Sequence, residues 1–227
     1  MTCCDRPQTM HPTAPGLTKS RALFAIILVM GLAMAAAADA QNLDCCTAST
    51  AAPAGVTPVL YNLPNGSGAP FAQAGSAAGP VDATITLTLR TDDCVPVVNF
   101  TATDMWLEKQ VVAGTGNFVA CTLGTTADAN TDADGVTTWT APLRAGGWST
   151  SGTMVVVNGA AVPGAPLNLR HNSADLNGDE VANLADIPLF ASDYLGTYAF
   201  RSDLWFDGAV NLSDIPRLAE GIGAACQ

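Results

Sequence analysis

The sequence predicts a mainly β protein that ends in a small α-helical module. Between residues 41 and 172, short segments of alternating apolar and polar residues are separated by Gly, Asn, Asp and Pro, with no long helical periodicity. After residue 172 one segment is duplicated, and apolar residues recur at helical spacing in each copy. A content of 48 % hydrophobic and 13 % charged residues is enough for a packed core and argues against disorder.

Residues 1–40 have the features of a secretory signal with an N-terminal extension. Lys19 and Arg21 precede an apolar run over 22–38, and small residues follow up to Ala40, where we expect cleavage and hence a secreted, extracellular protein. A retained membrane anchor is the alternative, although the run is slightly shorter than the ~20 apolar residues that a spanning helix needs. The true start could be Met10, and no later segment is apolar enough to span a membrane.

The rest of the chain is strongly acidic. From residue 41 onward it has 18 Asp and Glu against 6 Lys and Arg, a net charge of −12. This charge excludes nucleic-acid binding by counterion release, and there is no basic patch for an anionic membrane. Seven of the carboxylates fall in the C-terminal duplication, which indicates a cation site there.

The middle of the chain predicts short strands. Residues 41–80 are rich in Ala, Gly, Pro and Ser and are expected to form a loop-rich lead-in with one strand at 57–63. Residues 81–90 alternate between apolar and polar without a break, which predicts a strand with one buried and one solvent-exposed face. Such a series indicates a β-sandwich over 81–170, together with 57–63. Further strands are expected at 97–102, 104–109, 117–123, 135–141 and 153–159.

One turn in this region resembles a known pattern. The segment TDADGVTTW (131–139) is similar to the turn and strand of bacterial Ig-like repeats in secreted and surface proteins. The resemblance implies an Ig-like β-sandwich. Residues 160–173 then link it to a module over 171–227, and so short a link predicts that the module packs against the sandwich.

The C-terminal module is an internal duplication. DLNGDEVANLADIPLFA (175–191) and DLWFDGAVNLSDIPRLA (203–219) are identical at 9 of 17 positions, which predicts one structural unit used twice. Ca²⁺ takes six to eight oxygen ligands, which a twelve-residue loop supplies from positions 1, 3, 5, 7, 9 and 12. The sequence therefore predicts two calcium sites. Their ligands are Asp175, Asn177, Asp179, the carbonyl of Val181, Asn183 and Asp186 in the first loop, and Asp203, Asp207, the carbonyl of Ala209, Asn211 and Asp214 in the second.

A helix is expected after each loop. Pro188 and Pro216 suit a first turn, where no backbone N–H is needed. Leu189 and Arg217 would lie on the exposed faces of the two helices. Spacing of i, i+3, i+4 and i+7 predicts the buried faces as Ile187, Phe190, Ala191 and Tyr194, and Ile215, Leu218, Ala219 and Ile222.

Two loop–helix repeats with Asp at loop position 12 resemble a type I dockerin domain. The resemblance covers about 50 residues and implies an EF-hand-like pair that binds two calcium ions and docks onto cohesin domains of scaffold or cell-surface proteins. Two residues depart from the pattern. Glu180 stands at position 6 of the first loop, where the turn favours Gly, and Trp205 replaces the oxygen ligand at position 3 of the second. Ligand count favours the first site and turn geometry the second, and we give ligand count the greater weight.

Five cysteines follow residue 40: Cys45, Cys46, Cys94, Cys121 and Cys226. Export favours disulfides, and the odd number leaves one thiol free or bridged to another chain. Cys45 and Cys46 are poorly placed to pair with each other. We expect Cys94–Cys121, because both residues flank strands of the middle domain.

No catalytic motif is found, and we expect no enzyme. The only histidine after residue 40, His171, is expected to be an exposed linker residue. The favoured hypothesis is a secreted protein that docks onto a cohesin-like or other cell-envelope protein. The alternative is a polysaccharide-binding or polysaccharide-degrading subunit, with Trp106, Trp139 or Trp148 lining a sugar-binding face. A third is a structural protein in which the module is an intramolecular cap.

Overall fold

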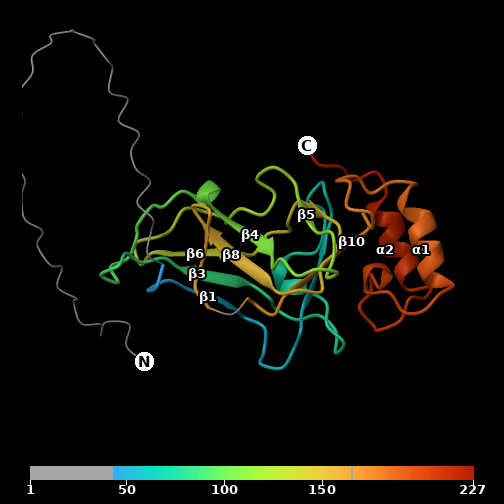
Figure 1. The fold of residues 1–227 in the computed structure, drawn as a ribbon, viewed down its shortest axis with the longest axis horizontal. Helices are drawn as coiled ribbons and strands as arrows, with labels where there is room; N and C mark the ends of the chain where they lie inside the picture. Colours follow the sequence, from blue (N-terminus) through green and yellow to red (C-terminus); the bar gives the residue numbers. More distant parts are fainter. Residues whose placement is uncertain (1–42, 165) are drawn as a thin grey trace, which may run out of the picture. The chain divides into compact units, whose positions relative to one another are not determined.

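The computed structural model describes residues 43–164 and 166–227, and this part of the chain is mainly β with two α-helices (Figure 1). The predicted signal over 1–40 lies outside the described residues. Among those described, no helix is both long and apolar enough to cross a bilayer. Three short 3-10 helices complete the regular structure: η1 (Phe71–Gln73), η2 (Ala102–Asp104) and η3 (Phe200–Ser202).

Two antiparallel sheets of three strands share one hydrophobic core, in the orders β1-β3-β6 and β4-β8-β9. Side chains alternate as predicted in β3, where Ile85 and Leu87 are buried between half-buried threonines. Trp139 is fully buried in this core, and its indole N–H donates to the carbonyl of Thr125 at 2.9 Å. The strand bounds are β1 (Thr47–Thr50), β3 (Ile85–Thr88), β6 (Val136–Trp139), β4 (Met105–Lys109), β8 (Thr153–Val157) and β9 (Ala160–Ala161).

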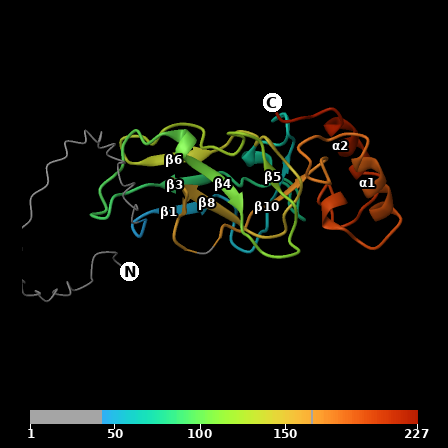
Figure 2. The ribbon, with the colours of Figure 1, turned by 45° about the horizontal axis from the view of Figure 1, so that its top comes forward.

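Two smaller strand pairs adjoin the C-terminal module. β2 (Val59–Asn62) pairs in parallel with β10 (Arg170–Ser173), which runs directly into the first repeat. β5 (Val119–Ala120) pairs antiparallel with β7 (Ala145–Gly146). Of the labelled strands in Figures 1 and 2, β5 and β10 lie nearest the two helices.

Most predicted strands are present, with shorter bounds, but three predictions about this region are wrong. The segment 97–102 forms no strand and instead leads into η2, and the lead-in contains β1. The link contains β10, so His171 is not an exposed linker residue. It is fully buried, with Nδ1 3.1 Å from Asn62 Nδ2 and Nε2 2.8 Å from Thr153 Oγ1. Burial lowers the pKa of His171 to about 3, which keeps the ring neutral.

The C-terminal module has helices α1 (Asp186–Tyr194) and α2 (Asp214–Gly221). Its hydrophobic core is shared with β2, as the short link predicts. The Asp193 carboxylate on α1 accepts two hydrogen bonds from the Arg201 guanidinium, which ties this helix to η3. The main members of the shared core are Val59 and Tyr61 from β2, Leu63 directly after it, and Leu176, Phe190, Leu204, Phe206 and Leu218 from the module.

The predicted inward faces of the helices are wrong in part. Phe190 and Leu218 are buried, but the exposed residues include Ile187, Ala191, Tyr194, Ile215 and Ala219. The cause is the residue that begins each helix. Asp186 and Asp214 are fully buried, so residues three and four places later turn inward with them. Leu189 therefore packs against the core instead of facing solvent, and Arg217 is half-buried.

The predicted Cys94–Cys121 disulfide is also wrong. The disulfides are Cys45–Cys94 and Cys121–Cys226, and Cys46 is a buried free thiol. The register between β1 and β3 pairs Thr47 with Thr88, and this pairing brings Cys45, two residues before β1, beside the turn after β3 that contains Cys94. Strand pairing, which spacing along the chain does not reveal, therefore decides the connectivity.

Candidate metal centre

Position 1 of each loop is a buried aspartate that accepts backbone N–H groups. Asp175 Oδ1 accepts from Gly178 at 2.8 Å, and its Oδ2 accepts from Glu180 at 3.0 Å. In the second loop Asp203 Oδ2 accepts the equivalent bond from Gly208 at 3.0 Å. Burial raises the pKa of Asp175 and of Asp203 above the ordinary value of a carboxyl. Negative charge at these positions is costly unless a cation compensates it.

Position 12 is a second buried aspartate, and it closes each loop. Asp186 Oδ1 accepts the N–H of Asn177 at 3.1 Å, and its Oδ2 accepts that of Asn183 at 2.9 Å. Asp214 accepts the same two bonds, both at 2.8 Å, from positions 3 and 9 of the second loop. The last residue of each predicted loop thereby holds positions 3 and 9 in the same way in both copies.

The remaining predicted ligands repeat as well. Asp179 and Asp207, at position 5, are exposed, and each accepts the N–H two residues later, at 3.2 and 3.0 Å. Asn183 and Asn211, at position 9, do the same at 2.7 Å in both loops. The position-7 residue Val181 contributes its carbonyl, which accepts from Asn183 Nδ2 at 3.1 Å. The two loops therefore share one backbone design.

Both loops turn through left-handed backbone at positions 4 and 6. In the first loop these are Gly178 (φ 72°) and Glu180 (φ 71°), and in the second they are Phe206 (φ 62°) and Gly208 (φ 86°). Each loop thus places one glycine and one larger residue in a conformation that favours glycine. Glu180 thus has the left-handed backbone expected at position 6, and Phe206 at position 4 of the second loop is a counterpart that the sequence does not reveal.

One buried atom in the second loop fits a cation. Asp203 is 3 % exposed, and its Oδ1 has no hydrogen-bond partner, while Oδ2 also accepts from the Tyr198 hydroxyl at 3.0 Å. A carboxylate oxygen that is buried without a partner is unfavourable, and a bound cation would satisfy it. The donors offered by both loops are hard oxygens, which suit Ca²⁺ better than transition metals.

Carboxylates alone do not form a metal cluster. Within the described ranges, no three His, Cys, Asp or Glu side chains lie together in a way that could hold an ion. The predicted sets also use amide and main-chain oxygens. Ion binding would therefore require the exposed Asp179 and Asp207 to move toward the buried carboxylates at positions 1 and 12.

Residues on and beside the strands hold both loops by their backbone, which the sequence did not indicate. In the first loop, the Asp175 carbonyl accepts the N–H of Gly147 at 2.9 Å. The start of the second loop is held by Asn172 on β10, whose side-chain amide donates to the Asp203 carbonyl at 3.0 Å. Both position-1 residues are thus fixed before any ion binds.

Trp205 offers no oxygen ligand, and it has a different contact. The Arg217 guanidinium lies 5.1 Å from the Trp205 ring centre and 4.9 Å from that of Tyr61. Tyr61 also donates its hydroxyl to the Arg217 carbonyl at 2.6 Å. Position 3 of the second loop is therefore anchored on α2 and β2.

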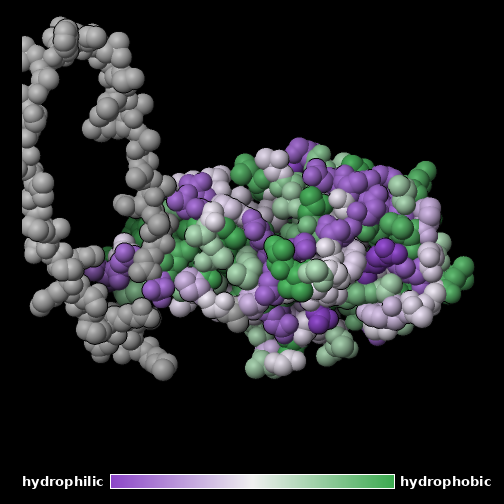
Figure 3. All heavy atoms as spheres, viewed as in Figure 1, coloured by the Kyte–Doolittle hydropathy of each residue, from purple (hydrophilic) through white to green (hydrophobic). Residues whose placement is uncertain are grey.

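The identity between the repeats extends to exposed apolar residues. Of the nine identical positions, four are predicted ligands and one is the buried pair Leu176 and Leu204. The other four are exposed in both copies, and Figure 3 shows hydrophobic side chains at the surface of this helical part. They are Leu184 and Leu212 (72 % and 70 % exposed), Ile187 and Ile215 (both 42 %), Pro188 and Pro216, and Ala191 and Ala219.

The three tryptophans that precede the repeats have different surroundings. Trp139 belongs to the core and Trp148 is half-buried. Trp106 is half-buried and lines a hollow of about 590 Å³ with Phe118 and Leu123.

No protein-family model matches the chain, and neither a curated protein nor a solved structure matches it. A function proposed for this chain therefore rests on its own residues and geometry.

Proposed function

We propose that the chain is a secreted, non-catalytic calcium-binding protein that docks onto a cohesin-like or other cell-envelope protein. Its C-terminal repeats would form an EF-hand-like, dockerin-like pair, and its strands an Ig-like β-sandwich that the pair localises. The predicted oxygen ligands, from Asp175 to Asp186 and from Asp203 to Asp214, would hold two Ca²⁺ ions. The common hydrogen-bond pattern of the loops and the orphaned Asp203 Oδ1 support calcium binding.

Docking is supported above all by the exposed apolar residues that the repeats share. Packing within the module does not require Leu184 and Ile187, or Leu212 and Ile215, because these side chains face solvent. Clustered exposed apolar residues mark interaction surfaces more often than isolated ones do. Each set begins two residues before the position-12 aspartate, so an ion bound in the loop would fix the surface next to it.

The test is capture of the envelope partner by the full chain, with calcium and with chelator. We expect calcium-dependent capture that Leu184→Asp and Leu212→Asp together reduce at least tenfold. Leu195→Asp is the matched control, because Leu195 is 86 % exposed in the same module but corresponds to Gly223 in the other repeat. Normal capture by the double variant, with calcium binding retained, would make the module a cap and not a dock.

Polysaccharide binding is a second candidate, supported by the hollow beside Trp106. A half-buried aromatic ring such as Trp106, next to polar groups, can stack against a sugar, and Glu108 and Lys109 also line this hollow. Screening against a glycan array tests this function. Binding that Trp106→Ala abolishes would support it, and absence of binding to any glycan would exclude it.

A further inference from the structure

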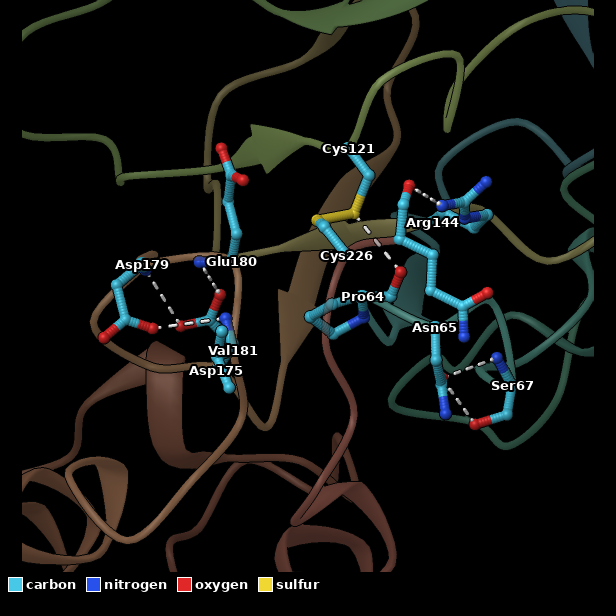
Figure 4. The surroundings of a disulfide bond; sticks show 11 residues. Pro64, Asn65, Ser67, Cys121, Arg144, Asp175, Asp179, Glu180, Val181 and Cys226 are labelled. Atoms are coloured by element: carbon cyan, nitrogen blue, oxygen red, sulfur yellow. Dashed lines mark hydrogen bonds between the residues drawn. A yellow bond between two sulfur atoms is a disulfide. The ribbon is translucent and has the colours of Figure 1, made fainter.

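We infer that the Cys121–Cys226 disulfide is a positioning element of the first loop, which raises the calcium affinity of that loop and not of the second. This inference rests on the proposed calcium binding. Figure 4 shows the disulfide beside Asp175, Asp179, Glu180 and Val181.

The C-terminal tail pairs with positions 6 to 8 of the first loop. The N–H of Ala182 donates to the Ala224 carbonyl and that of Gly223 to the Ala182 carbonyl, both at 2.8 Å. The N–H of Cys226 donates to the Glu180 carbonyl at 3.0 Å. These bonds complete an antiparallel bridge between Val181 and Ala225.

This pairing aims the predicted ligand at position 7. In extended backbone, successive carbonyls point in opposite directions. The Ala182 N–H donates to the tail, and the Val181 carbonyl lies on the opposite side of the same trans peptide group, so this carbonyl points away from the tail and into the loop. Its hydrogen bond with Asn183 Nδ2 lies on that side. The bond from Cys226 also holds Glu180, the residue whose left-handed backbone is least favourable in this loop.

The disulfide fastens the tail to the strands that hold position 1. Cys121 directly follows β5, and its N–H donates to the carbonyl of Arg144, the residue before β7, at 3.0 Å. Gly147, just after β7, donates to the Asp175 carbonyl. Positions 1 and 7 are therefore braced by one two-stranded ribbon, at position 7 through the covalent bond. Arg144 adds a second tie, since its Nη2 donates to the Gln227 carbonyl at 2.7 Å.

The second loop has no such brace. Its positions 6 to 8 (208–210) make no backbone–backbone hydrogen bond with any other segment of the described chain, and Gly208 and Ala209 are exposed. A duplicated module with one braced and one unbraced loop provides its own internal control.

The experiment is a calorimetric calcium titration of the full chain with Cys121→Ser and Cys226→Ser combined. Asp203→Asn is added to isolate the first site, and Asp175→Asn to isolate the second. We expect about a tenfold loss of affinity at the first site, within the range of typical coupling between sites, and less than a twofold change at the second. Cys45→Ser with Cys94→Ser is the matched control, which should change neither affinity.

Unchanged first-site affinity, or equal losses at both sites, would overturn the inference. If the unsubstituted chain binds no calcium, the proposed function itself fails, which is a different result. If the double cysteine variant does not fold, hydrogen exchange in the unsubstituted chain tests the inference instead. Coupling is reciprocal, so calcium should slow hydrogen exchange at the Gly223 amide at least fivefold, and an unchanged rate would contradict the inference.

Discussion

The two loops share most of their hydrogen bonds but differ in their ligands and in their support. The first has an oxygen at every predicted position and is braced by the tail, yet it places Glu180 in left-handed backbone. The second has Gly208 at that position but lacks an oxygen at position 3, and Asp203 Oδ1 is buried without a partner. The first loop thus has both the larger number of oxygen ligands and the better-supported backbone. We therefore expect the first loop to bind calcium more tightly than the second.

The largest effect should come from removing position 12. Asp186 accepts three backbone N–H groups and Asp214 accepts two, and each orphaned donor costs about 1–3 kcal/mol. Urea unfolding in chelator should therefore show a larger loss of stability for Asp186→Ala than for Asp214→Ala. The Asp→Asn variants, which keep one acceptor oxygen, should lose less. Equal losses in the two alanine variants would mean that the loops do not differ in this respect.

Exchanging the residues at position 3 should change the relative calcium affinities of the two sites. Trp205→Asn supplies the missing oxygen, so calcium affinity of the second loop should rise about tenfold, or ~1.4 kcal/mol. In chelator the same variant should lose about 0.5–1 kcal/mol of stability, because the contact with Arg217 is lost. Asn177→Trp is the reciprocal change and should weaken the first site. If neither affinity moves in calorimetry, position 3 does not ligate.

Position 6 should give the smallest effect. Gly208→Ala should cost about 1 kcal/mol, purely from its left-handed backbone, since an added Cβ would meet no atom within 4 Å. Glu180→Gly should relieve the same strain in the first loop and stabilise it by less than about 1 kcal/mol. Thermal unfolding of both variants in chelator measures the difference. Destabilisation by Glu180→Gly would show that the Glu side chain contributes more than its backbone costs.

The local features of this chain could be predicted from its sequence. Alternation located β3, and the duplication located α1 and α2 to within a few residues. The rotation of the helices could not be predicted, because Ile187 and Leu189 each form an apolar stripe with Phe190. The buried Asp186 decides between them, through hydrogen bonds to a loop whose fold the helical periodicity does not describe.

Features that depend on contacts far along the chain were missed. β1 is a half-exposed strand of Thr, Ala and Ser that gains its structure by pairing with β3. His171 looked like a linker residue because its neighbours are polar, yet it is buried by the parallel pairing of β10 with β2. The pairing of the tail with the first loop could likewise not be predicted, since the disulfide that fixes the tail joins Cys226 to Cys121 across 105 residues.

The most direct test of the account is the number and order of calcium sites in the full chain stripped by chelator. Calorimetric titration should show two ions bound, with the tighter site lost in Asp175→Asn and the weaker one lost in Asp203→Asn. Absence of binding, or loss of the tighter site in Asp203→Asn, would contradict it.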